Sequence, residues 1–208
     1  MLSSPVSGTI FNDLLSETWT QGIPGSDVGT SGSANVWTLD LGNQEWDESL
    51  DTARDLGAQY VWCGTHSDGR MLSELPDDEI DVAARQVEDR GLQFFLLDGA
   101  GLFKTVHLAD LQPGKMLEHP QFREHFDKLE RSMEVSARLG VPATGCSSFA
   151  WPAEYTGGKP TWPMRWATRG GIIADGDLEK LVEAFTLVAD LADSYEVDVA
   201  FLMMMWNY

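Results

Sequence analysis

The sequence predicts an α/β domain built on a parallel sheet, and three observations support this class. From residue 34 onward, strand-like segments alternate with segments whose apolar residues recur at helical spacing. The same leucine–glycine–small pattern leads from a helix to a strand at Leu56-Gly57-Ala58 and at Leu139-Gly140-Val141. Two apolar runs, Leu92–Leu97 and Val197–Met205, are typical of buried parallel strands. This alternation indicates right-handed βαβ units.

The first two βα units are expected between residues 34 and 90. Ala34–Leu41 alternates as a strand does, and Glu45–Leu56 carries apolar residues at helical spacing and ends before Gly57. Gln59–Gly64 is expected to be the second strand, because it is rich in aromatic and β-branched residues. Pro76–Arg90 is expected to be the second helix, because acidic residues fill its first turn.

The remaining units follow the same order. Leu92–Leu97 is expected to be a strand buried on both faces, and Pro120–Leu139 a long amphipathic helix. Pro142–Phe149 is a weaker strand of small residues, and Val197–Met205 is the fifth strand after a helix over Asp177–Tyr195. The apolar residues expected on one buried side of that last helix are Leu178, Leu181, Val182, Phe185, Val188, Ala189 and Ala192.

Length and composition set the domain organisation. Residues 1–33 are rich in Ser, Gly and Thr and predict a flexible N-terminal arm, which leaves residues 34–208 as the domain. A hydrophobic content of 43% in 208 residues is ample for a packed core. No apolar run approaches the roughly 18 residues needed to span a bilayer, and the N-terminus lacks a secretory pattern, so we expect a cytoplasmic protein. Cys63 and Cys146 are too few for a disulfide framework and are expected to be buried thiols.

The charge of the chain is strongly negative. Its formal net charge is −19, from 33 acidic and 14 basic side chains, of which five are lysines. A surface of this sign disfavours nucleic acid and anionic membranes as partners. An acidic, lysine-poor surface over an ordinary core favours a halophilic protein in a cytosol at molar salt, where charges are screened within roughly 3 Å. The alternative is an acidic protein from an ordinary cytosol.

Three stretches carry a family resemblance, namely Asp47–Gly64, Phe126–Pro142 and Leu178–Tyr208. Together with the order of elements over residues 34–208, they resemble the xylose-isomerase-like (β/α)8 barrels of the sugar phosphate isomerase/epimerase superfamily. The resemblance implies an incomplete (β/α)8 TIM-type barrel, and the alternative is an open five-stranded, doubly wound parallel sheet. It also implies isomerase or epimerase chemistry on a sugar or polyol, by proton transfer beside a carbonyl.

The same resemblance implies a divalent metal, Mn²⁺ or Mg²⁺, whose ligands are missing from this chain. Family members bind it through groups at the ends of strands five to eight, and Leu202 takes the fifth-strand place that usually holds Glu. An isobutyl group cannot replace a hard oxygen ligand. Because the chain stops at Tyr208, we expect either a piece of a longer barrel or a homologue that completes its sheet. In the second case a second copy or a partner chain pairs with the apolar Phe201–Tyr208 edge.

The loop after the second strand holds the candidate acid/base group. Function in parallel α/β folds lies at the carboxyl ends of strands, and this loop reads Gly-Thr-His-Ser-Asp-Gly. His66 is the candidate catalytic residue, with Asp68 orienting it. Some sugar isomerases of the resembled family carry a His at this place. The alternative is an ordinary turn in which His66 hydrogen-bonds locally.

Asp98 follows the third strand, where a strand-end carboxylate is expected to bind substrate. Gly99 and Gly101 permit close approach of a ligand to the backbone. They do not complete a dinucleotide fingerprint, because Lys104 stands where the third glycine is needed. The alternative is a tight loop with a solvated Lys104.

The segment Ser147–Gly171 after the fourth strand is long, aromatic and basic, as binding loops often are. Aromatic rings cover the C–H faces of sugars, and guanidinium groups bind hydroxyls, carboxylates or phosphates. The predicted substrate-binding residues here are Trp151, Glu154, Trp162, Arg165 and Arg169. The alternatives are a subunit interface and a Trp-rich plug over the barrel mouth.

Two functions remain open at this point. The first is a sugar or polyol isomerase or epimerase with a small carbohydrate as its ligand. The second is a non-catalytic sugar-binding or partner-completed subunit, which the leucine at position 202 favours.

Overall fold

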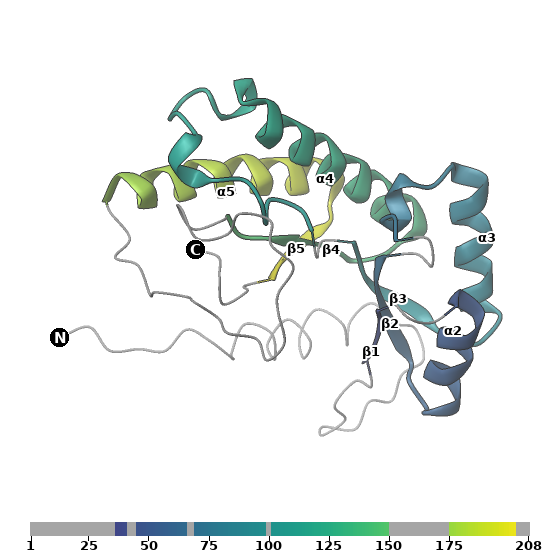
Figure 1. The fold of residues 1–208 in the computed structure, drawn as a ribbon. Coiled ribbons are helices and arrows are strands. Elements are labelled where there is room, and N and C mark those ends of the chain that lie inside the picture. The colour runs from purple at the N-terminus through teal and green to yellow at the C-terminus, as the bar shows by residue number, and fades with distance from the viewer. Residues whose placement is uncertain (1–35, 41–44, 66–68, 99–100, 150–174, 203–208) are drawn as a thin grey trace, which may run out of the picture. The chain divides into compact units, whose positions relative to one another are not determined.

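The computed structural model describes residues 36–40, 45–65, 69–98, 101–149 and 175–202, all within the unit Val36–Tyr208 (Figure 1). The predicted arm, residues 1–33, lies outside the described residues. The strands are β1 (Val36–Asp40), β2 (Tyr60–Thr65), β3 (Gln93–Leu97), β4 (Ala143–Ser147) and β5 (Asp198–Leu202). The helices are α2 (Trp46–Asp55), α3 (Asp77–Glu88), α4 (Pro120–Leu139) and α5 (Asp175–Tyr195), with short 3₁₀ turns η3 (Leu72–Glu74), η4 (Leu108–Asp110) and η5 (Met116–Glu118).

The five strands form one parallel sheet in the order β1-β2-β3-β4-β5. Each crossover leads to the adjacent strand, and right-handed crossovers of this kind place every helix on the same face of the sheet. Figure 1 shows α2, α3, α4 and α5 on one side of the strands. The doubly wound alternative requires helices on both faces, so the described elements have the barrel type of topology instead.

Local signals explain where the elements begin and end. Helix α4 begins at Pro120, which suits the first turn, and the His119 side chain accepts a hydrogen bond from the Phe122 backbone N–H. It ends at Gly140, whose φ of 67° is left-handed and favours glycine. The sequence predicts both ends of this helix correctly, and most other element ends lie within one or two residues of their predicted positions.

The core lies between the sheet and the helices and has two parts. One packs α2 and α3 against β2 and β3, with Leu50, Val61 and Ile80 fully buried. The other packs α4, α5 and the β3–α4 connection around aromatic rings that include Phe122 and Phe149. The helix-covered face of the sheet is therefore packed at β2, β3 and β4.

The expectation that Leu92–Leu97 is buried on both faces is wrong for the first half of β3. Gln93 is exposed, Phe94 and Phe95 are half-buried, and only Leu96 and Leu97 are buried. A continuous apolar run has no periodicity that shows which side chains are buried. The sequence alone therefore does not distinguish a strand covered on both faces from a strand whose first residues are accessible to solvent.

The predicted buried side of α5 is wrong in part. The helix buries Leu181, Ala184, Val188 and Ala192 at spacings of three and four residues. Leu178, Val182 and Ala189 are exposed, because they lie on a neighbouring stripe of the helix that does not face the core.

The β3–α4 connection is not the tight loop with a solvated lysine that the sequence suggests. Its apolar side chains, including Phe103 and Leu108, are fully buried, and Lys104 is half-buried. The Lys180 Nζ atom of α5 donates to the Leu108 carbonyl at 3.1 Å, which ties the connection to that helix. The connection is thus part of the core.

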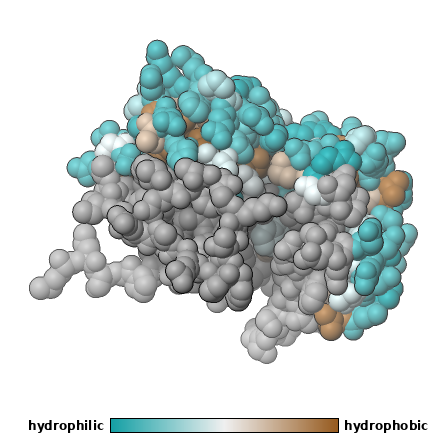
Figure 2. All heavy atoms as spheres, in the orientation of Figure 1, coloured by the Kyte–Doolittle hydropathy of each residue, from teal (hydrophilic) through white to brown (hydrophobic). Residues whose placement is uncertain are grey.

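Ion pairs join neighbouring helices on the outer layer. Arg90 pairs with Asp47 and Asp51 of α2 at 2.8 Å each, and Arg138 of α4 pairs with Asp81 of α3 at 2.7 Å. Figure 2 shows that hydrophilic residues dominate the visible surface of the described helices. Within the described ranges, no helix combines the length and apolarity needed to cross a membrane.

Candidate functional site

The candidate site is the edge of the sheet at which the strands end, because parallel strands bring their carboxyl ends together there. Asp98 after β3 and Ser148 and Phe149 after β4 lie at this edge, and all three are buried. Asp98 is the one predicted site residue among those that the structure describes. The predicted residues outside the described ranges are His66, Asp68, Trp151, Glu154, Trp162, Arg165 and Arg169, whose roles stay predictions.

The backbone N–H and the backbone carbonyl of Asp98 both form hydrogen bonds with β2. Its N–H donates to the Cys63 carbonyl at 2.7 Å, and its carbonyl accepts from the Trp62 indole Nε1–H at 3.2 Å. Its φ of 54° is left-handed, a conformation that Asp tolerates better than most residues. The chain therefore turns sharply as it leaves β3, and the turn is held against the neighbouring strand.

The carboxylate of Asp98 points into the protein and is fully buried. Oδ1 accepts from the Leu72 backbone N–H at 2.9 Å, and Oδ2 accepts from the Ser132 hydroxyl at 2.6 Å. Ser73 and Ser132 hydroxyls lie 3.0 Å apart. Burial raises the pKa of the Asp98 carboxyl, although hydrogen bonds from Ser132, Ser73 and Leu72 act in the opposite direction. These contacts give Asp98 a structural role, while a direct contact with substrate stays a prediction.

Trp62 reaches the same edge from the face opposite the helices. Its strand neighbours Val61 and Cys63 belong to the core beneath α2 and α3, so the alternation of β2 turns Trp62 to the other face. The ring is half-buried, and its N–H is held by the Asp98 carbonyl. Trp62 is not among the residues predicted for the site from the sequence, although the period of two in Tyr60–Thr65 is a signal that places it on this face.

Solved structures with a similar fold include two sugar epimerases and a xylose isomerase-like TIM barrel protein. D-psicose 3-epimerase from Clostridium cellulolyticum H10, solved with D-tagatose, matches with a TM-score of 0.54 and 19% identity over 85% of this chain and 55% of its own. The 3-keto-D-glucoside 4-epimerase YcjR from E. coli matches with a TM-score of 0.52 and 14% identity over 81% and 56%. A xylose isomerase-like TIM barrel protein from Mycobacterium smegmatis, in complex with magnesium, matches with a TM-score of 0.51 and 13% identity over 78% and 48%.

The fold is that of the xylose-isomerase-like TIM barrels. The resemblance noted in the sequence is confirmed at this level. The chain spans about half the length of these solved structures, consistent with an incomplete barrel. No protein-family model matches the sequence, and no curated protein matches it.

The two cysteines of this barrel chain are buried, as expected. Burial raises the pKa of both thiols, and the nearby Asp98 carboxylate raises that of Cys63 further. A thiol held in its neutral form is a poor nucleophile, so neither side chain suits covalent catalysis.

The described residues do not assemble a metal site of the kind found in metal-dependent barrels. No group of three or more His, Cys, Asp or Glu side chains lies close enough together to hold an ion within the part of the chain that the structure describes. Asp98 is the predicted strand-end carboxylate at this edge, and both of its carboxylate oxygens already accept hydrogen bonds from the protein. The described residues therefore do not fit a divalent metal on their own.

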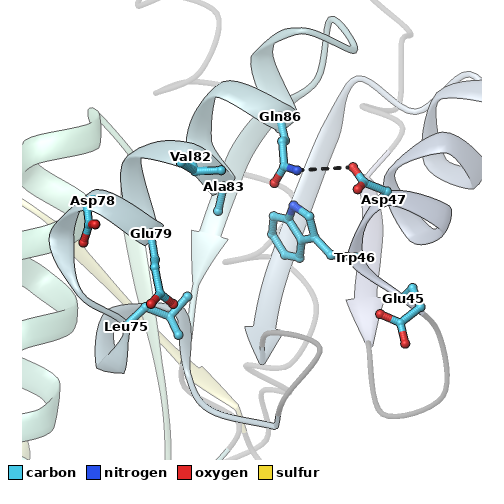
Figure 3. A pocket seen from close by; sticks show the side chains of 9 residues that line it. All are labelled: Glu45, Trp46, Asp47, Leu75, Asp78, Glu79, Val82, Ala83 and Gln86. Carbon is cyan, nitrogen blue, oxygen red and sulfur yellow. Dashed lines mark hydrogen bonds between the residues drawn. The ribbon is translucent and has the colours of Figure 1, made fainter.

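A separate groove of about 400 Å³ lies between α2 and α3 on the outer layer (Figure 3). Trp46, Leu75, Val82 and Ala83 provide its apolar part, and carboxylates surround it. Two of these carboxylates already have basic partners, since Asp47 pairs with Arg90 at 2.8 Å and Glu79 with Arg70 at 3.8 Å. The groove lacks the arrangement of acid and base that the sheet edge is predicted to carry.

Proposed function

We propose that this chain forms the carbohydrate-binding part of a sugar isomerase or epimerase site. The observation that carries the proposal is the sequential parallel sheet with helices on one face, shared with two sugar epimerases over more than four-fifths of this chain. In such folds the loops at the carboxyl edge of the sheet bind the ligand. The proposed ligand is a small ketose or keto sugar.

In the proposed reaction a proton leaves the carbon beside a carbonyl and returns to the other face of that carbon. His66 follows β2 directly and is proposed as the acid/base group for one of these two proton transfers, since a single side chain on one face of the planar intermediate does not reach the other face. An imidazole suits either step because its ordinary pKa lies near neutrality. Asp68 is proposed to orient the ring by accepting a hydrogen bond from its second nitrogen.

The segment after β4 is proposed to hold the sugar. The rings of Trp151 and Trp162 supply apolar faces for its C–H groups, while Arg165 and Arg169 donate hydrogen bonds to its hydroxyls. Glu154 accepts hydrogen bonds from hydroxyls. Asp98, which is buried at the same edge, supports this site from behind.

A divalent metal, when bound in proteins of this fold, polarises the substrate carbonyl. The described residues do not supply its ligands, and Leu202 stands in the sequence where the resembled family has Glu. This leucine favours a second candidate function, a sugar-binding subunit without turnover that is completed by a second copy or a partner chain. Strand β5 is an edge of the described sheet and is the proposed place of that pairing.

The net charge supports the proposed setting, a salt-rich cytosol. A formal charge of −19 repels nucleic acid and anionic membranes and is well screened at molar salt. Experiments on this protein are therefore best run in KCl at molar concentration.

The test is exchange of the proton beside the carbonyl. The chain is incubated in D₂O with D-fructose, D-psicose or D-tagatose, with Mn²⁺, Mg²⁺ or a chelator, and deuterium at C3 is followed by NMR. Wild type is expected to incorporate deuterium and His66→Gln to lose the exchange, while His107→Gln, in the β3–α4 connection, keeps it.

Binding measured by calorimetry separates the two candidate functions. Sugar binding without exchange under every metal condition supports the non-catalytic subunit. A protein that neither exchanges deuterium nor binds any of the three ketoses overturns the carbohydrate proposal.

A further inference from the structure

Asp98 joins three segments that are far apart in the sequence. Its backbone closes the end of β3 onto Cys63 and Trp62 of β2. Its carboxylate reaches Leu72, 26 residues earlier, and Ser132 of α4, 34 residues later. The backbone N–H, the backbone carbonyl and both carboxylate oxygens of Asp98 therefore each have a hydrogen-bond partner outside β3.

The surroundings of the carboxylate are closed to solvent. Asp98, Leu72 and Ser132 are 0% exposed, and Ser73 is 2% exposed. A buried carboxylate is costly unless hydrogen bonds compensate it, whereas a leucine of similar size would fill the same space without that cost. The directional, charge-assisted hydrogen bonds are the property that a leucine cannot supply.

Those hydrogen bonds act on the segment that returns from the loop after β2. Leu72 begins the 3₁₀ turn η3, only four residues after Asp68 in the sequence. The Met71 backbone N–H is bound in turn by the Glu74 side chain at 3.0 Å. The Asp98 carboxylate thus holds the described end of this connection against β3 and α4.

We propose that Asp98 is a positioning residue for the carbohydrate site, acting through the η3 turn and through the Trp62 ring. The inference rests on the proposed function, because the turn and the ring border the edge at which the sugar is proposed to bind. Asp98 contacts neither the sugar nor the reacting atoms in this role. Its charge fixes the position of the groups that surround them.

Helix α4 offers a matched pair of variants. Ser132→Ala removes the hydroxyl that donates to Asp98, and Ser136→Ala removes a hydroxyl 2.8 Å from the Thr144 hydroxyl of β4. Both serines are 0% exposed and lie one helical turn apart, so the two substitutions make the same change at equal depth. Only Ser132 is connected to Asp98.

The experiment combines amide hydrogen exchange with ketose binding, using D-fructose and D-psicose as probes. In Asp98→Asn, exchange of the Leu72 amide is expected to accelerate about tenfold, because a neutral amide oxygen accepts more weakly than a carboxylate. Ketose affinity is expected to fall about tenfold in Asp98→Asn and less in Ser132→Ala. Ser136→Ala is expected to keep the wild-type affinity and Leu72 exchange rate, even though its melting temperature falls as much as that of Ser132→Ala.

Three results would overturn the inference. Unchanged Leu72 exchange in Asp98→Asn would show that the carboxylate does not hold the turn. Faster exchange with unchanged ketose affinity would show that its role is structural only, as would equal losses of affinity in the two serine variants. A wild-type chain that binds no ketose removes the proposed function itself, and with it the positioning role, whatever the exchange rates are.

Discussion

Replacing Phe122 by alanine is expected to destabilise the domain by about 4 kcal/mol. The ring is 0% exposed, and its centroid lies 5.2 Å from that of Phe103 and 6.1 Å from that of Phe149. Truncation removes about 100 Å² of buried apolar surface, which contributes about 2.5 kcal/mol at about 25 cal/mol per Å². A remaining cavity of roughly 60 Å³ adds about 1.5 kcal/mol at about 24 cal/mol per Å³.

The cluster also matters for the proposed site, because it joins the β3–α4 connection, the start of α4 and the end of β4. Phe149 belongs to the predicted binding segment Ser147–Gly171, and it is the last residue of that segment that the structure describes. Loosening the cluster is therefore expected to weaken ketose binding as well as folding.

The assay is urea unfolding followed by far-UV circular dichroism at fixed molar KCl, with the m-value checked for each variant. The control is Val182→Ala on α5, whose side chain is 59% exposed and whose effect is expected to stay within about 0.5 kcal/mol. A loss below about 1 kcal/mol in Phe122→Ala would refute the packing described for this cluster.

Three further predictions concern charge, backbone and pH. Arg90→Gln is expected to lower the free energy of unfolding by about 1 kcal/mol in low salt, because the exposed Asp47 and Asp51 carboxylates lose their partner. Urea unfolding in 1 M KCl should show a smaller loss, because salt screens the ion pairs. An equal loss at both salt concentrations would contradict the ionic origin. Gly140→Ala is expected to lower the free energy of unfolding by about 1 kcal/mol, because the left-handed φ of 67° strains an alanine although its Cβ would meet no neighbouring atom. The measurement is thermal melting, and an unchanged melting temperature would contradict this backbone strain. Burial raises the pKa of Asp98 in the folded state, so its ionised form disfavours folding above that pKa and the penalty disappears as the pH falls towards the ordinary value of 3.8. Wild type should therefore gain stability relative to Asp98→Asn as the pH falls through this window, and a flat or opposite difference in urea titrations would contradict the assignment.

Local chemistry explains why so many elements were predictable. Proline at the first turn and a left-handed glycine after the last mark α4, and both signals act within a few residues of the chain. Apolar spacing likewise located α2 and α3, and β-branched and aromatic residues located β2. The order of these elements was sufficient to suggest the barrel family, which the structural matches confirm at the level of fold.

The parts that were not predictable depend on contacts between distant residues. Leu178 and Val182 have the same hydrophobicity as buried positions of α5, and only the docking of the helix decides which stripe faces the core. The position of the Trp62 ring was not predictable for the same reason, because its hydrogen-bond partner is the carbonyl of Asp98, 36 residues later in the sequence.

The sequence by itself determined the kind and order of the described strands and α-helices, because capping residues, glycines and apolar spacing act over a few residues. It also placed a carboxylate at the end of the third strand. Only the tertiary structure decided what that carboxylate does, since the partners of Asp98 come from η3 and α4 and meet it only when the sheet and helices have packed. The hydrogen bonds and the burial around a carboxylate determine its role and its pKa, and for Asp98 they form only when the chain folds.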